Sequence, residues 1–181
     1  MTVVPTHMSR RVGHVSHRPQ AHLRERDQQT GVTEASPVPA KQPMRYEIGF
    51  VVRFDHRMVV DNGAAGPTAD DVIAGHGSLW DKAGAEIGRF DANTRLTETL
   101  EDGDRRLLFV TYTFGKGEDS IVILGTGTYT GTHGLMNQQA TNIFSIAGGT
   151  GAFLAAGGQC GITRLDKINY NVKCTAFVPG Y

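Results

Sequence analysis

The sequence predicts an all-β protein, an eight-stranded antiparallel β-barrel preceded by an N-terminal extension. From residue 44 onward, about eight short runs rich in β-branched and aromatic residues follow one another, and no segment has the period of a long helix. This pattern indicates an antiparallel barrel or sandwich. Some runs, such as LLFVTYTF and IVIL, are apolar on both faces. Because a solvated sheet face would be polar, we expect a closed barrel whose outer wall meets a partner subunit.

Short polar turns separate the expected strands. The first strand covers residues 44–54, where apolar side chains alternate with a mixed set. The apolar set is Tyr46, Ile48, Phe50, Val52 and Phe54. The later strands are expected at residues 73–81, 86–100, 105–114, 120–131, 140–147, 159–165 and 168–178. Turn signals such as EDGDR, GKGEDS and LDK lie between them.

The glycine-rich segment GGTGAF, residues 148–153, does not fit a phosphate-binding loop. A P-loop needs a Lys and a Ser or Thr after its glycines, and a dinucleotide site needs a strand–loop–helix unit. Neither is present, because the chain continues into a second glycine cluster. We therefore expect a tight turn between two strands, in which Gly supplies positive φ angles.

Residues 1–43 form the predicted N-terminal extension, and residues 44–181 the barrel domain. The extension is rich in Arg, His, Gln, Thr and Pro and cannot bury enough apolar surface to order itself alone. A short helix is expected at residues 20–29, followed by an extended linker. The extension is expected to be a lid over a cavity or, alternatively, an arm ordered by subunit contacts.

Composition excludes several classes of function. Lys and Arg total 18 and Asp and Glu total 18, so a basic footprint for nucleic acid or for a membrane surface is missing. No apolar run approaches the roughly 18 residues needed to span a bilayer, and no secretory signal is recognised. Cys160 and Cys174 are too few for a disulfide framework and lack metal spacing. We expect reduced cysteines in a cytoplasmic protein without a metal site.

Three segments, IVILGTGTYTG, FSIAGGTGAFLAAGGQ and NYNVKCTAFV, resemble the calycin-like barrel of the allene oxide cyclases and dirigent proteins. In that family a GG[ST]GxF segment closes a turn near the barrel end, and GGTGAF fits it. RYEI, residues 45–48, resembles the first strand, whose Glu projects into the cavity. The likeness covers residues 44–178 and implies that the glycines are architectural.

Within this family, the chain is most similar to the bacterial spirotetronate and spirotetramate cyclases. Its long N-terminal extension resembles that of the pyrroindomycin-type enzyme. The resemblance implies an intramolecular [4+2] cyclisation of a linear polyene polyketide with a tetramate or tetronate head, catalysed by a homodimer without any cofactor. The oxylipin cyclases carry an Asn two residues after the Glu, where this chain has Gly49, and a Ser-Pro turn that is missing here.

The resemblance also implies which side chains line the cavity. An inward Glu47 brings Arg45, Gly49 and Val51 inward as well. Glu47 and Arg106 are the expected catalytic residues, although they could instead form an internal ion pair. Asp81 is either a cavity residue or a solvated group at a strand end, whereas His76 and Trp80 are expected on the outer wall. The expected substrate-binding residues are Asp81, Leu79, Phe90, Thr94, Val110, Tyr112, Phe114, Ile123, Tyr129 and Gln138.

Three other functions stay open at this stage. A non-catalytic carrier of a hydrophobic small molecule would need the same apolar lining, because catalysis by shape leaves no residue signature. An oxylipin cyclase would need Glu47 in the cavity. A structural dimerisation module would have a fully packed interior.

Overall fold

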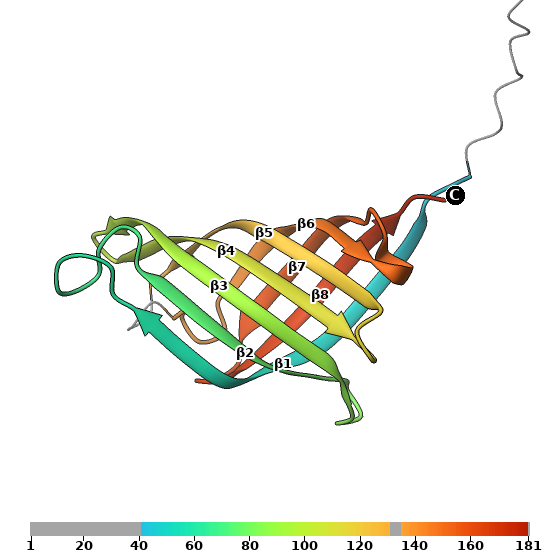
Figure 1. Cartoon of the computed structure of the whole chain (residues 1–181), viewed down its shortest axis with the longest axis horizontal. Coiled ribbons are helices and arrows are strands. Elements are labelled where there is room, and N and C mark those ends of the chain that lie inside the picture. The colour runs from blue at the N-terminus through green and yellow to red at the C-terminus, as the bar shows by residue number, and fades with distance from the viewer. Residues whose placement is uncertain (1–40, 131–134, 181) are drawn as a thin grey trace, which may run out of the picture. The chain divides into compact units, whose positions relative to one another are not determined.

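The computed structural model describes residues 41–130 and 135–180, which form a closed antiparallel barrel (Figure 1). Each strand pairs with the next along the chain, and β8 pairs with β1 to close the sheet. This confirms the predicted fold class. The strands are β1 (Met44–Val60), β2 (Val72–Trp80), β3 (Glu86–Leu100), β4 (Gly103–Phe114), β5 (Asp119–Tyr129), β6 (Thr141–Thr150), β7 (Gly157–Arg164) and β8 (Asn169–Val178). In the described part of the chain, no helix has the length and hydropathy needed to cross a lipid bilayer.

The predicted helix at residues 20–29 and almost all of the candidate lid lie outside the described residues. The domain boundary at residues 43 and 44 and the role of the extension therefore stay predictions.

The apolar alternation of β1 points into the barrel. Phe50 and Val52 are only 2% and 4% exposed, and the Phe50 ring meets the rings of Tyr112 and Phe114 edge to face at 4.9 and 5.6 Å. Since successive side chains of a strand point to opposite faces, Glu47 must point outward. The expectation that Arg45, Glu47, Gly49 and Val51 face the cavity was wrong. Burying the aromatic and aliphatic side chains of β1 is favourable, whereas burying the charged Glu47 would cost free energy.

β1 continues six residues beyond the predicted strand. The prediction ended too early because a β-bulge interrupts the alternation of this strand. The pairing of β1 with β2 shifts between Phe54 and His56, which leaves Asp55 as the extra residue. Before the bulge the even-numbered side chains point inward, whereas after it Arg57 does. A regular period-2 pattern therefore could not reveal this half of the strand.

The GGTGAF segment ends β6 with its first three residues and begins the predicted turn to β7 with its last three. Gly149 pairs with Ile121 of β5, and residues Gly151–Phe153 form a short 3-10 turn, η2. Gly151 has a φ of +57°, and a Cβ on it would lie 2.7 Å from the carbonyl oxygen of Glu118. The side chain of Asp119 accepts a hydrogen bond from the backbone N–H of Ala152 at 2.8 Å. The close approach of the β4–β5 turn explains why glycine stands here.

The outer wall carries exposed apolar side chains. Phe109 of β4 and Leu124 of β5 are direct cross-strand neighbours, 47% and 41% exposed. His76 is exposed as well, which agrees with its predicted place outside the barrel. The expected homodimer stays a prediction.

Cys160 and Cys174 form a disulfide bond, contrary to the expectation of reduced thiols. They are direct partners in the β7–β8 ladder, with Cα atoms 4.0 Å apart, and both are buried. The count of cysteines could not reveal this pairing, because it depends on the register of two strands. The predicted cytoplasmic location stays a prediction.

Replacing both cysteines, Cys160→Ala with Cys174→Ala, is expected to lower the free energy of unfolding by about 2–4 kcal/mol, because the cross-link restricts the unfolded chain. Urea denaturation followed by circular dichroism measures the change. Reductant should destabilise the wild type and leave the double variant unaffected. Equal midpoints for the oxidised and the fully reduced wild type would contradict the prediction.

Candidate functional site

The barrel interior is packed at one end and hollow at the other. Near the β4–β5 turn, the rings of Tyr46, Phe50, Phe114 and Phe153 lie against one another at 5.5–5.7 Å between centroids. The opposite end carries the β1–β2 loop and the β3–β4 turn, which lie together in Figure 1. Asp104 of β4 pairs there with Tyr129 of β5. The hollow half opens toward this second end, which we call the mouth.

The hollow half contains a largely apolar cavity with a volume of about 80 Å³. Gly75 lines it, and the ring of Phe54 packs so closely on this glycine that a Cβ there would lie 2.7 Å from it. Met136, which follows β5 and is 3% exposed, covers part of it. The other main lining side chains are Phe54, Arg57, Phe90, Ala92, Thr94, Leu108, Val110, Tyr112, Tyr129, Phe144 and Tyr170.

The structure brings five of the predicted substrate-binding residues to this cavity. They are Phe90, Thr94, Val110, Tyr112 and Tyr129. Leu79 and Ile123 are fully buried inside the barrel and Phe114 lies in its packed end, but none of these three lines the cavity. The inward register expected for these strands, β2 to β5, is therefore correct.

Asp81 and Gln138 do not reach the cavity. Asp81 lies in the β2–β3 turn, where its carboxylate accepts hydrogen bonds from the backbone N–H groups of Ala83 and Ala85 at 2.9 and 2.8 Å. This agrees with the alternative of a group at a strand end. The exposed Gln138 donates to the carbonyl oxygen of Leu165 at 2.8 Å. Both side chains stabilise loops.

Glu47 lies on the outer wall, with 59% of its side chain exposed. It accepts hydrogen bonds from Arg45 at 2.9 Å and from the Thr175 hydroxyl at 3.0 Å. These hydrogen bonds, that from Arg45 above all, lower the pKa of Glu47 below its usual value. The internal Glu47–Arg106 ion pair considered from the sequence is therefore wrong.

Arg106 points inward and is 4% exposed. Its Nη2 donates to the carboxylate of Asp104 at 2.7 Å, two residues earlier on the same face of β4. Its Nε and Nη1 atoms have no hydrogen-bond partner among the described residues. Gly127 stands opposite Arg106 on β5. Asp104 is the true ion-pair partner, and an inward i, i+2 pair of opposite charges was the signal for it.

Arg57 and two tyrosines complete the polar groups around the cavity. Burial lowers the pKa of Arg57, and the nearby positive charges of Arg106 and Arg164 lower it further. Burial raises the pKa of Tyr112 and of Tyr129 far above neutrality, so both phenols stay protonated. Sequence reasoning missed Arg57 because it lies beyond the bulge. Within residues 41–130 and 135–180, no three His, Cys, Asp or Glu side chains gather in a way that could hold a metal ion.

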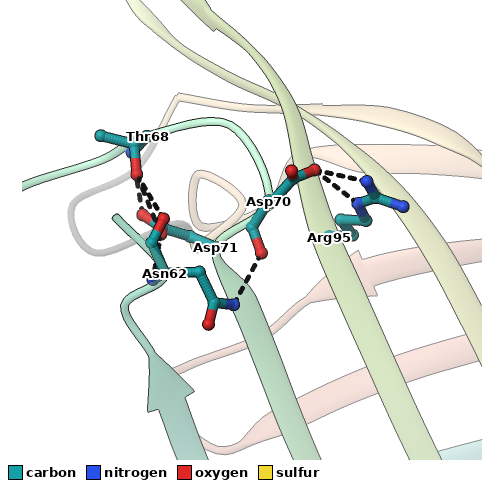
Figure 2. Close-up of polar contacts among 5 residues, drawn as sticks. All are labelled: Asn62, Thr68, Asp70, Asp71 and Arg95. Carbon is teal, nitrogen blue, oxygen red and sulfur yellow. Dashed lines mark hydrogen bonds and ion pairs between the residues drawn. The ribbon is translucent and has the colours of Figure 1, made fainter. Parts of the chain in front are cut away.

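The β1–β2 loop forms one wall of the mouth and is fixed by Asp71 (Figure 2). The Asp71 carboxylate accepts hydrogen bonds from the backbone N–H groups of Asn62 and Thr68, at 2.9 and 2.8 Å, and from the Thr68 hydroxyl at 3.2 Å. Asp70, next to it, forms an ion pair with Arg95 of β3. These contacts tie the loop to itself and to the barrel.

The chain matches no protein-family model and no curated protein. Among solved structures, pyocyanin demethylase is 16% identical, with a TM-score of 0.62 over 72% of this chain and 99% of that one. A pterocarpan synthase dirigent protein is 16% identical, with a TM-score of 0.59 over 82% and 98%. The Diels–Alderase AbmU from Streptomyces koyangensis is 14% identical, with a TM-score of 0.55 over 74% and 69%. At these identities the likeness shows a shared fold.

Asp104→Asn is expected to destabilise the protein by about 3–5 kcal/mol, because it leaves the buried charge of Arg106 without its partner. Urea denaturation at neutral pH measures the loss. Adding Arg106→Met should recover most of the stability, since the buried charge is then removed as well. A single variant as stable as the wild type would show that Asp104 does not compensate Arg106.

Proposed function

We propose that this chain is a cofactor-free cyclase for an intramolecular [4+2] cycloaddition. The proposed substrate is a linear polyene polyketide with a tetramate or tetronate head, and the product contains a spiro-linked ring. The observation that carries the proposal is an apolar, aromatic cavity that is closed at one end of the barrel and bounded by polar groups at its mouth.

The proposed reaction requires mainly that the protein hold the substrate in a suitable conformation. Two carbon–carbon σ bonds form from the diene and the dienophile of one molecule, no group leaves, and the mass is unchanged. Holding the two reacting parts in a near-attack geometry is worth up to about 7–11 kcal/mol. In the proposed reaction, the packed aromatic and aliphatic walls of the cavity supply this restraint.

The wall of the cavity also offers hydrogen-bond donors to a carbonyl group next to the dienophile. The Thr94 hydroxyl is buried and has no hydrogen-bond partner among the described residues. The neutral phenols of Tyr112 and Tyr129 line the same space. A donor fixed in a site that excludes water stabilises charge that develops on a carbonyl oxygen in the transition state.

The comparisons support the proposal through the fold, because this barrel is similar to that of a Diels–Alderase. It is also similar to that of a demethylase and of a dirigent protein, so the fold alone does not decide the chemistry. A carrier of a hydrophobic small molecule would use the same cavity without turnover. The outward position of Glu47 counts against an oxylipin cyclase that needs this residue inside.

Incubation with a linear polyene tetramate is expected to give an isomer of unchanged mass and single stereochemistry, formed faster than without protein. Liquid chromatography with mass spectrometry follows the product. Ala92→Leu, which places a larger side chain in the cavity, should lower kcat/KM roughly 10- to 100-fold by displacing the reacting chain. The matched control is Asn93→Leu, on the outer face of the same strand, which should leave kcat/KM unchanged.

Two outcomes would contradict the cyclase. Binding of the polyene without any acceleration would identify a carrier. Equal kinetic effects of Ala92→Leu and Asn93→Leu would place the reaction outside the cavity.

A further inference from the structure

The wall of the apolar cavity contains a single charged side chain. Among the described residues that line this space, Arg57 of β1 is the only one with a charge at neutral pH. No Asp or Glu of the described chain lines it. A negatively charged group inside the cavity would therefore meet one positive charge on the wall and no negative one.

Two phenols of the same wall lie close to this charge. Burial raises the pKa of Tyr170 and lowers the pKa of Arg57, and it is the largest influence on both. Beyond burial, each of the two groups acts on the pKa of the other, so the phenol of β8 and the guanidinium of β1 lie near one another. Tyr170 acts in the same way on Tyr129 of β5, after the larger effect of burial. Three strands thus bring three groups with polar hydrogens to one part of the cavity.

The two phenols are available as hydrogen-bond donors. Neither hydroxyl forms a hydrogen bond with another residue of the described chain. Unlike the Nε and Nη1 atoms of Arg106, these two hydroxyl oxygens are not sealed inside the protein. Both phenols stay protonated at neutral pH, since burial raises the pKa of each. An acceptor oxygen of a ligand would give them a partner.

Phe54 fixes this part of the wall before any ligand arrives. Its ring meets the ring of Tyr170 edge to face at 5.6 Å and that of Phe90 at 4.8 Å. Its backbone N–H donates to the carbonyl oxygen of Ile168 at 2.9 Å, which ties β1 to the start of β8. Side chains that are already held in place need little further ordering when a ligand binds, which favours affinity.

The carboxylate that acts on Tyr170 is occupied elsewhere. Asp166 accepts hydrogen bonds from the backbone N–H groups of Ile168 and Asn169 at 2.9 and 2.8 Å, and from the Asn169 side chain at 2.8 Å. Arg164 stands directly opposite Tyr170 in the β7–β8 ladder and adds a second positive charge. Its guanidinium donates only to carbonyl oxygens within the described chain. The charges beside Tyr170 are therefore more positive than negative.

A third positive charge acts on Arg57 from further along the mouth. It belongs to Arg106, and the ion pair with Asp104 offsets it.

We propose that Arg57, Tyr129 and Tyr170 bind the acidic head group of an amphipathic ligand inside the apolar cavity. The head group is an oxyanion, a carboxylate or an enolate, and the apolar body lies against Phe90, Val110 and Phe144. Arg57 supplies the charge, because a guanidinium matches the geometry of such an anion. This inference deepens the proposed function and rests on it for the identity of the substrate, because it names the end of the cavity at which the head group binds.

Isothermal titration calorimetry of the full chain at neutral pH tests the head-group site without turnover. The probes are 2,4-decadienoic acid, its primary amide and 2,4-decadienylamine, which share one chain and differ in the charge of the head. A carboxyl group with a pKa of about 4 is ionised at this pH. We expect the acid to bind the wild type about 10- to 100-fold more tightly than the amide, because charge-assisted hydrogen bonds are lost with the charge. The amine should bind more weakly than the amide.

Arg57→Met keeps most of the length of the side chain and removes its charge, so it should bind acid and amide with equal affinity. Tyr170→Phe removes one donor and leaves the ring, and it should reduce the preference for the acid several-fold even if Arg57→Met does not fold. The matched control is Arg53→Met, on the exposed outer face of the same strand, which should keep the full preference. Circular dichroism checks the fold of each variant.

Equal affinity of the wild type for acid and amide would overturn the head-group site, whichever variants fold. So would a folded Arg57→Met variant that keeps the full preference for the acid, because the charge would then be recognised elsewhere. If the acid is preferred as expected and the polyene tetramate is not converted, the cyclase proposal fails while the head-group site stands.

Discussion

The closure of the sheet by β1 and β8 is the constraint on which the other features of this barrel depend. Closure gives every strand a partner on both sides and separates each strand into one inner and one outer face. The inner space is then fixed, and side-chain size decides where it is filled. Aromatic rings meet edge to face at one end, whereas the other end contains the apolar cavity.

The bulge at Asp55 changes the chemistry of the mouth. Without it, the even-numbered side chains of β1 would continue inward and Arg57 would point to solvent. With it, a guanidinium group joins the wall of an otherwise apolar cavity. One extra residue in one strand therefore changes which side chain of β1 reaches the cavity.

The buried Arg106–Asp104 pair is by itself weak evidence for stability. Removing two charges from water costs several kcal/mol per ion, and well-packed apolar residues often stabilise a protein as well as a buried pair does. Here the compensation is incomplete, because two nitrogens of Arg106 have no partner in the described chain. Such a buried donor without a partner costs stability.

The sequence by itself determined most strand positions, because alternation and turn chemistry are local properties of the chain. The family resemblance then turned the inner faces of β2 to β5 the right way. Leu108, Val110 and Tyr112 could be placed inward in this way. The sequence by itself did not determine the disulfide between Cys160 and Cys174 or the bulge at Asp55. Tertiary structure decided these two features, because each depends on the register between neighbouring strands. In β1, the apolar alternation of the strand itself identified the inner face correctly. The family resemblance, which implied that Glu47 points inward, was misleading for this strand.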